Sequence, residues 1–229
     1  MVLDFTPLTV LHDALARVLP DGVALACTDP GAPEEEGALF AIEAAAVARA
    51  VPARRAEFAA GRLAAHRALA GLGRLPEPVA MGPDRAPVWP DGVAGSISHC
   101  EGACVALAAE AARFPSLAVD LEPDADLPED LWPLICREDE RAWLESLPEA
   151  ERGRAARLIF SAKECAFKLQ YPLTRRMLDF SAVAVAIEPG RGRFRVRFPD
   201  DLGAALPQLA GPGRFGRAAG FVYCLMFAV

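Results

Sequence analysis

Two acidic residues near the middle of the chain have the spacing of a metal site. Asp120 and Glu122 are two positions apart at the end of the apolar run SLAVDLEP. On a β-strand, residues two apart project from the same face, so both carboxylates would lie side by side. Mg²⁺ prefers such oxygen ligands and completes its shell with water and substrate phosphate. Two surface acids at a solvated strand end would have the same pattern, and this alternative stays open here.

A later segment, FSAKECAFK, carries polar residues that fit the same chemistry. On a helix with about 100° per residue, Ser161, Glu164 and Lys168 share one polar face. The opposite, apolar face consists of Ala155, Ile159, Ala162, Ala166 and Leu169. A Glu and a Lys four residues apart are also an ordinary surface pair. However, of the 24 Lys and Arg residues only Lys163 and Lys168 are lysines, which indicates a site that needs a compact, rotatable ammonium.

Basic residues elsewhere are candidates for anion binding. Arg55, Arg62 and His66 fall on one side of a predicted helix, and Arg54 lies near them. His99 follows Ser98 at the end of a predicted strand, where imidazole and hydroxyl can both reach a phosphate oxygen. A solvated helix face and a structural histidine are the alternatives.

The elements that must position these residues are helices and strands in both halves of the chain. The pattern predicts helices over 52–69 and 148–169. It predicts strands over 95–99 and 104–108 around a Glu101–Gly102 turn, continued as a meander by 116–121, and further strands over 182–187, 194–198 and 221–227. We interpret the glycine-rich segment 211–216 as a loop, because too few residues follow it for a nucleotide-binding crossover. The fold class is therefore α+β with two similar lobes.

Composition limits the class of protein. With 229 residues and 53% hydrophobic residues the chain can bury a core, and its net charge of −7 argues against a general nucleic-acid or anionic-membrane binder. No segment has the length of a membrane span or the pattern of a secretory signal. The six cysteines lack a CxxC pair and are expected to be free thiols, so we predict a cytoplasmic protein.

Four segments occur in a recognisable order between about residues 50 and 200: RRAEFAAGR, DRAPVWPDGVAGSISHCEG, AVDLEP and FSAKECAFKLQYPLTRRMLDF. Together they resemble the bacterial branch of the Sfp/EntD-type 4′-phosphopantetheinyl transferases, although Ala118 stands where the family motif usually has glycine. The resemblance implies transfer of the 4′-phosphopantetheine arm of coenzyme A to a serine of an acyl or peptidyl carrier protein, with release of adenosine 3′,5′-bisphosphate. It also implies the fold of that family: a pseudo-twofold arrangement of two α+β lobes, 1–112 and 113–229, with the active site in the cleft between them.

The resemblance further implies roles for individual residues. The Mg²⁺ ligands, with Mn²⁺ as an alternative ion, would be Asp120, Glu122 and Glu164. The residues of the transfer step would be Glu164, which accepts the serine proton directly or through water, Lys168, which holds the phosphates, and Asp120. Coenzyme A would contact Arg54, Arg62, Arg85, Ala86, Pro87, Ser98, His99, Asp120, Lys168 and Leu178, with Ser98 and His99 at the 3′-phosphate and Leu178 on the pantetheine path. Lys163 precedes the glutamate as it does in the family.

Two other functions remain as alternatives. The D-x-E and E-x-x-x-K patterns are also compatible with a Mg²⁺-dependent phosphodiesterase or nuclease, and a third hypothesis is a coenzyme A-binding module without catalysis. Carrier domains are commonly acidic, so Arg175 and Arg176 are predicted to form part of a docking patch. We expect a monomer without nucleic-acid or membrane partners. The sequence leaves open which carrier is served, in fatty-acid, polyketide, nonribosomal-peptide or siderophore synthesis.

Overall fold

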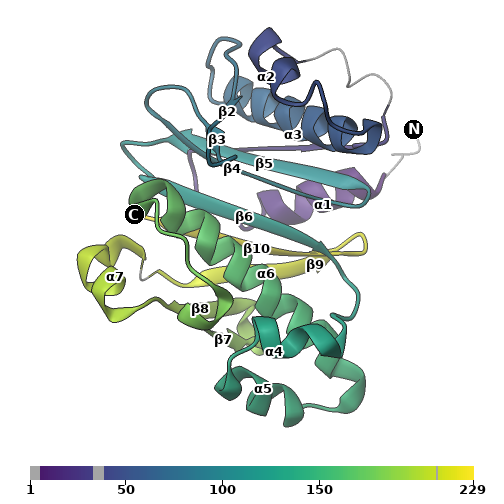
Figure 1. Ribbon diagram of the computed structural model, residues 1–229, viewed down its shortest axis with the longest axis vertical. Helices are drawn as coiled ribbons and strands as arrows, with labels where there is room; N and C mark the ends of the chain where they lie inside the picture. The colour runs from purple at the N-terminus through teal and green to yellow at the C-terminus, as the bar shows by residue number, and fades with distance from the viewer. Residues whose placement is uncertain (1–5, 33–38, 210) are drawn as a thin grey trace.

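The computed structural model describes residues 6–32, 39–209 and 211–229 and contains helices packed on two main β-sheets (Figure 1). The first sheet has the order β1-β5-β4 and consists of β1 (Val23–Thr28), β4 (Val93–Cys100) and β5 (Ala103–Glu110). A separate two-stranded sheet is formed by β2 (Ala80–Met81) and β3 (Pro87–Val88). The larger sheet has the order β6-β10-β9-β8-β7, with β6 (Ser116–Pro123), β7 (Ala184–Glu188), β8 (Arg193–Arg197), β9 (Gly213–Ala218) and β10 (Phe221–Ala228). The predicted mixture of helix and sheet is confirmed.

Two long helices dominate the remaining structure. The α-helices are α1 (Pro7–Ala16), α2 (Ala41–Ala46), α3 (Pro52–Gly71), α4 (Trp132–Ile135), α5 (Glu138–Glu145), α6 (Glu149–Thr174) and α7 (Asp200–Ala205). Helix α3 begins with Pro52 in its first turn, where a missing N–H costs nothing. Helix α6 continues beyond its predicted end, through Pro172, and stops at Arg175, whose φ of 56° is left-handed. We call the described residues up to Glu110 the α3 half and those from Ser116 onward the α6 half.

The apolar stripe predicted for α6 forms a core. Ile159, Ala162, Ala166 and Leu169 are fully buried. The last three belong to a cluster shared with β6 and β10. One expectation for this helix was wrong: Ser161, predicted on the polar face, is also fully buried. It lies beside Cys224 of β10, so the polar face is narrower than periodicity indicated.

A second core lies between the two main sheets. It joins Leu11 and Leu15 of α1 to Leu107 of β5, Leu121 of β6 and Leu225 of β10. The N-terminal helix, for which the sequence offered no motif, thus fills the space where the two sheets face each other (Figure 1). A third cluster packs α3 against the other face of the first sheet. The result is a sandwich in which α3 and α6 lie on the outer faces.

The predicted meander was wrong at its third strand. Strands β4 and β5 do form a hairpin around Glu101–Gly102, but β6 belongs to the other sheet and pairs with β10. Strand β6 runs beside β4, and serine hydroxyls join them. Ser96 Oγ accepts a hydrogen bond from Val119 N at 3.1 Å, and Ser98 Oγ accepts one from Leu121 N at 3.1 Å. We call this junction the serine seam.

The glycine-rich segment was also interpreted wrongly, because it is not a loop throughout. Strand β9 begins at Gly213 and includes Gly216. A Cβ atom on Gly213 would lie 2.1 Å from the Phe194 ring, and one on Gly216 would lie 2.3 Å from the Tyr223 hydroxyl. The glycines therefore make room for aromatic side chains on the sheet, which is a packing role and not a turn signal.

Two further expectations concern the thiols and the membrane. All six cysteines lie in the described part of the chain, and none of them forms a disulfide, as predicted. Cys104, Cys136, Cys165 and Cys224 are buried. Among the described residues, no helix combines the length and the apolar character needed to cross a bilayer.

Candidate active site

An ion pair lies at the centre of the serine seam. Asp120, which is 3% exposed, accepts hydrogen bonds at Oδ1 from Lys168 Nζ at 2.7 Å and from Ser98 Oγ at 3.1 Å. Lys168 also donates to Ser98 Oγ at 2.9 Å. Burial alone would lower the pKa of Lys168, but the charge and hydrogen bond of Asp120 raise it above its ordinary value. The ammonium is therefore held charged, and the Ser98 hydroxyl already has three partners.

The environment of Asp120 suits a cation. Its second oxygen, Oδ2, is buried and has no hydrogen-bond partner among the described residues. Burial and the charge of Asp120 raise the pKa of Glu122 to about 7 and also raise the pKa of Glu164. A divalent ion would relieve this mutual repulsion and fill the free oxygen position. The donor chemistry therefore fits Mg²⁺, although the described part of the chain contains no cluster of three or more His, Cys, Asp or Glu side chains already arranged around a metal position.

Arg157 is a neighbour of this site that the sequence analysis missed. Its Nη1 donates to Glu122 Oε2 at 3.0 Å, and its Nη2 donates to Asp126 O at 3.1 Å. It fixes both the carboxylate and the segment that follows β6. The available signal was its spacing: Arg157 precedes Glu164 by seven residues, so the two share a face of α6.

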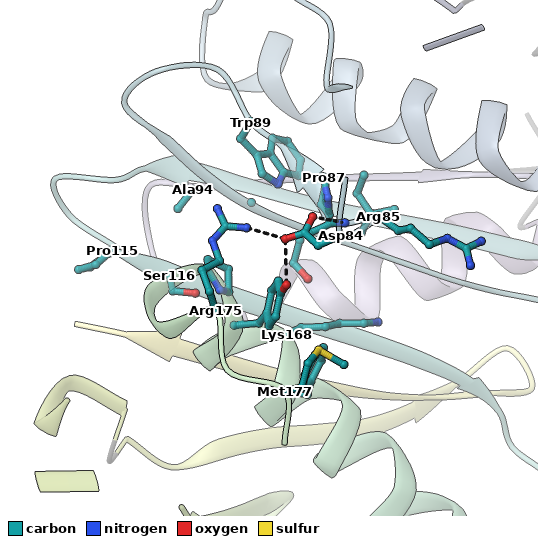
Figure 2. A pocket seen from close by; sticks show the side chains of 17 residues that line it. Asp84, Arg85, Pro87, Trp89, Ala94, Pro115, Ser116, Lys168, Arg175 and Met177 are labelled. Atoms are coloured by element: carbon teal, nitrogen blue, oxygen red, sulfur yellow. Dashed lines mark hydrogen bonds and ion pairs between the residues drawn. The ribbon is translucent and has the colours of Figure 1, made fainter. Parts of the chain in front are cut away.

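A cavity of about 320 Å³, which we call the main cavity because Lys168 lines it, lies between the two halves and reaches the seam (Figure 2). Its walls come from the segment 84–89, the first part of β4, the start of β6 and the second half of α6. The predicted coenzyme A residues among them are Arg85, Ala86, Pro87 and Lys168. Across its mouth, Asp84 accepts hydrogen bonds from Tyr171 Oη at 2.9 Å and from Arg175 Nη1 at 3.0 Å.

A second cavity of about 200 Å³ adjoins the first. Glu164 and Leu178 line it, and it shares Phe167 and Met177 with the main cavity. Glu164 and Lys168 therefore line different cavities. The predicted docking arginines lie nearby but are both paired, Arg175 with Asp84 and Arg176 with Asp201.

Arg54 and His99 meet at the other end of the seam. Arg54 Nη1 lies 2.8 Å from His99 Nε2, and both approach Glu57. Burial, and then the neighbouring guanidinium of Arg54, lower the pKa of His99. Two residues that the resemblance assigns separately to coenzyme A, one on β4 and one on α3, are thus adjacent in space although they are 45 residues apart in sequence.

The anion-binding stripe predicted on α3 is only partly accessible to solvent. Arg62 is 6% exposed and stacks on Phe58 with 4.3 Å between its guanidinium carbon and the ring centroid. Burial lowers its pKa to about 10, and its Nε has no hydrogen-bond partner among the described residues. His66 lies 2.9 Å from the buried Glu43 carboxylate. This side of the helix faces other elements of the fold, so only part of the stripe can meet solvent.

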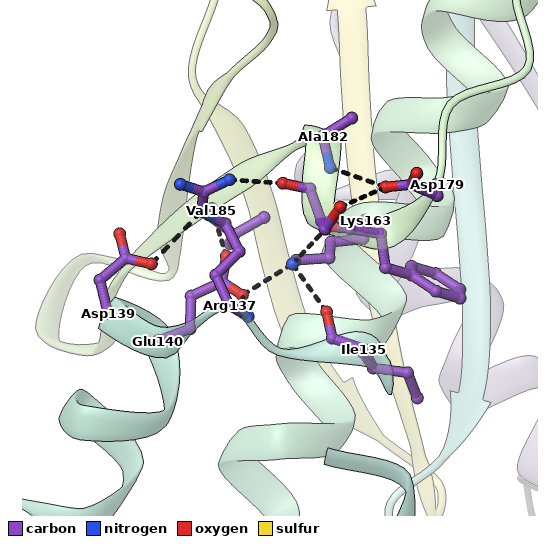
Figure 3. Close-up of polar contacts among 10 residues, drawn as sticks. Ile135, Arg137, Asp139, Glu140, Lys163, Asp179, Ala182 and Val185 are labelled. Carbon is purple, nitrogen blue, oxygen red and sulfur yellow. Dashed lines mark hydrogen bonds and ion pairs between the residues drawn. The ribbon is translucent and has the colours of Figure 1, made fainter. Parts of the chain in front are cut away.

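Lys163 lies in a separate polar cluster around Glu140 (Figure 3). It is 2% exposed, and its Nζ lies 2.7 Å from Glu140 Oε2 and 2.8 Å from the carbonyl oxygens of Ile135 and Phe180. Five residues separate it from Lys168, which corresponds to about 140° around a helix. The compositional argument therefore located one lysine of the site and one lysine of the fold.

Comparisons with known proteins agree with the sequence resemblance. Residues 42–109 match the model of the 4′-phosphopantetheinyl transferase N-terminal domain, and residues 116–209 match that of the 4′-phosphopantetheinyl transferase superfamily. The chain is 43% identical over 188 residues to 4′-phosphopantetheinyl transferase Svp of Streptomyces mobaraensis, which covers 80% of this chain and 75% of that protein. It is 36% identical over 188 residues to 4′-phosphopantetheinyl transferase Npt of Nocardia iowensis, covering 77% and 83%. Enterobactin synthase component D of Salmonella typhimurium is 40% identical over 117 residues, covering 50% and 47%. The chain therefore belongs to the 4′-phosphopantetheinyl transferase superfamily.

Proposed function

We propose that this enzyme transfers 4′-phosphopantetheine from coenzyme A to a serine of an apo acyl or peptidyl carrier protein and releases adenosine 3′,5′-bisphosphate. The observation that carries the proposal is the ion pair between Lys168, which lines a cavity between the two halves, and the buried Asp120, whose Oδ2 has no hydrogen-bond partner among the described residues. A cationic donor beside a vacant carboxylate oxygen suits a phosphate ligand that arrives with a divalent ion.

The roles proposed for the residues follow from their positions. Asp120, Glu122 and Glu164 would hold Mg²⁺ or Mn²⁺, which supplies positive charge beside the pyrophosphate oxygens when bound. Lys168 stabilises the negative charge that grows on the leaving pyrophosphate oxygen as the phosphorus–oxygen bond breaks. Glu164 accepts the serine proton, a role favoured by its raised pKa.

The remaining proposed contacts divide between binding and positioning. Arg54 and His99 would bind the 3′-phosphate, and Arg85, Ala86, Pro87 and Leu178 would line the path of coenzyme A. Ser98 would orient Asp120, since its hydroxyl is already bonded to that carboxylate. Arg62 would support the nucleotide end from within α3.

We further propose that the chain forms two pseudo-symmetric lobes, 1–112 and 113–229, with the substrate cleft between them. The main support is the position of the cavity, whose walls come from both halves. The protein would act as a cytoplasmic monomer on acidic carrier domains. Arg175 and Arg176 would exchange their present carboxylate partners for acidic residues of the carrier.

The direct test is a mass measurement. The protein is incubated with coenzyme A, Mg²⁺ and several apo carrier proteins, and each carrier is weighed by mass spectrometry. We expect the phosphopantetheine mass gain with the wild type and its loss with Glu122→Gln and Glu164→Gln. As a control, Glu151→Gln removes an exposed acid from α6, the helix that carries Glu164, and should leave transfer unchanged.

Two results would contradict the proposal. No mass gain with any carrier would reject the transfer reaction, and cleavage of coenzyme A without a carrier product would favour a phosphodiesterase. Near-normal transfer by both glutamine variants would reject the assignment of Glu122 and Glu164 but not the reaction itself.

A further inference from the structure

The main cavity contains a hydrogen-bond donor without an acceptor. Trp89 lines the cavity, and its indole Nε1 is buried with no hydrogen-bond partner among the described residues (Figure 2). Buried polar groups in proteins are nearly always paired, because desolvation without a partner costs free energy. An unpaired donor at a cavity wall therefore calls for an acceptor that enters from outside the chain.

The position of this indole is fixed by packing and not by an acceptor. A Cβ atom on Gly95 of β4 would lie 2.4 Å from Cε2 and Cζ2 of Trp89, so the ring lies directly against the strand backbone. The third-nearest atom is Cδ2 at 2.6 Å, and all three belong to the six-membered ring, so it is this ring that packs against β4. Gly95 thus allows the close approach that holds the ring, and no side chain is used to satisfy the nitrogen.

A second tryptophan in the same chain gives the contrast. Trp132 donates from its Nε1 to the carbonyl oxygen of Leu127 at 3.0 Å. That indole is satisfied within the fold and does not line the main cavity. Trp132 thus has its indole N–H satisfied within the fold, whereas the N–H of the cavity-lining Trp89 has no acceptor among the described residues.

We propose that the indole N–H of Trp89 donates a hydrogen bond to an acceptor atom of coenzyme A in the main cavity. The proposal rests on the function proposed above. Lys168 lines the same cavity and suits a phosphate, so the acceptor belongs to a part of the ligand adjoining a phosphate. The amide carbonyls of the pantetheine arm and the ring nitrogens of adenine share this chemistry, and Pro87 and Phe167 offer flat apolar surface to either.

Isothermal titration with three ligands separates these two sources. Coenzyme A contains both parts, 4′-phosphopantetheine lacks the adenine, and adenosine 3′,5′-bisphosphate lacks the pantetheine arm. We expect Trp89→Phe to weaken coenzyme A binding at least about tenfold and to weaken only one of the two fragments, which identifies the acceptor. Trp132→Phe should leave all three Kd values unchanged while lowering the Tm.

An isosteric replacement separates the N–H from the ring. Benzothienylalanine at position 89 keeps the shape of indole but has sulfur in place of the N–H group. We expect it to weaken binding as Trp89→Phe does. If it binds all three ligands like the wild type, the ring alone matters and the proposal is overturned.

The other outcomes also decide the question. Unchanged Kd values for Trp89→Phe, or equal weakening of both fragments, would overturn the proposal, since equal weakening indicates a general change of the pocket. A wild-type protein that binds none of the ligands would reject the proposed function together with this proposal. A protein that binds coenzyme A normally but modifies no carrier would reject the transfer reaction and leave the Trp89 result valid.

Discussion

Two buried glutamates, one in each half of the molecule, are built into the fold on the same plan. In the α3 half, Glu43 lies near the start of α2 and accepts a hydrogen bond from Phe40 N at 2.9 Å, three residues earlier. It also accepts one from Val79 N at 2.7 Å, just before β2. Its third partner is His66 of α3, 23 residues later, at 2.9 Å.

The α6 half repeats this arrangement with different side chains. Glu140 lies near the start of α5 and accepts hydrogen bonds from Arg137 N at 2.8 Å and from Val185 N of β7 at 2.7 Å. Its cationic partner is Lys163 of α6, at 2.7 Å and at the same separation in sequence as His66 has from Glu43. This match agrees with the proposed relation between the two lobes.

The difference lies in what the partner does beyond the glutamate. The His66 side chain is 14% exposed, whereas that of Lys163 is 1% exposed and also donates to two carbonyl oxygens, those of Ile135 and Phe180. An ammonium has three donors, and an imidazole has at most two. Phe180 lines the cavity that Glu164 also lines, so the lysine ties α6 to the wall facing it. The same arrangement around a buried glutamate thus stabilises only the fold in the α3 half, whereas in the α6 half it also supports the wall of the candidate site.

The largest expected effect comes from breaking the lysine pair. Lys163→Met leaves the Glu140 carboxylate buried without its cation, so we expect the free energy of unfolding to fall by about 3–5 kcal/mol. Denaturant unfolding measures this. The double variant Lys163→Met, Glu140→Gln should recover part of the loss, because the uncompensated charge is removed while an acceptor remains. A loss below about 1 kcal/mol in the single variant would show that Lys163 is dispensable.

A smaller effect is expected from the histidine pair. His66→Leu removes one hydrogen bond from Glu43 but leaves its two backbone donors, so the free energy of unfolding should fall by about 1–3 kcal/mol. The transfer rate under folding conditions should stay unchanged, because His66 lines neither of the two cavities at the site. A lower kcat with normal stability would mean that the two pairs do not differ as described.

The smallest effect concerns acid sensitivity. Burial alone would raise the pKa of Glu43, but the hydrogen bonds from His66, Phe40 and Val79 lower it below its ordinary value of 4.5. A lowered folded-state pKa adds stability that is complete above the ordinary value and disappears as the pH falls through the folded one. The stability difference between wild type and Glu43→Gln should therefore be constant near neutral pH and shrink in acid. Thermal unfolding between about pH 3 and 7 tests this, and a difference independent of pH would contradict it.

The parts of the fold that follow from local periodicity could be predicted from the sequence. The apolar stripe of α6, the shared face of Asp120 and Glu122, and the β4–β5 hairpin depend on residues a few positions apart. Side chains near in sequence on one element have their relative directions set by the helix or strand itself. The position of Lys168 beside Asp120 follows from the same reasoning once the two elements pack together.

The errors concern residues whose surroundings come from distant segments. The composition assigns Lys163 to the same site as Lys168, but its acceptors belong to α5, the end of α4 and the turn at Phe180. The local sequence around Gly213 predicts a loop, because it does not show that the Phe194 ring of the neighbouring strand packs against this glycine. Arg62 carries a charge in a helix face that the fold buries. In each case the structural role of the residue depends on a neighbour that tertiary packing brings close. The spacing of residues along a local stretch of sequence does not reveal that neighbour.

The serine seam has a consequence for how this protein can change over evolutionary time. In an ordinary sheet, backbone hydrogen bonds along the whole length of two strands hold them together, so no single substitution can change how the strands pair. Here the joint between β4 and β6 depends on the side chains of Ser96 and Ser98. A single codon can therefore alter how the two halves are joined without disturbing either sheet. Since the Ser98 hydroxyl also donates a hydrogen bond to Asp120, a substitution of this one residue would change both the contact between the halves and the position of a carboxylate in the candidate site.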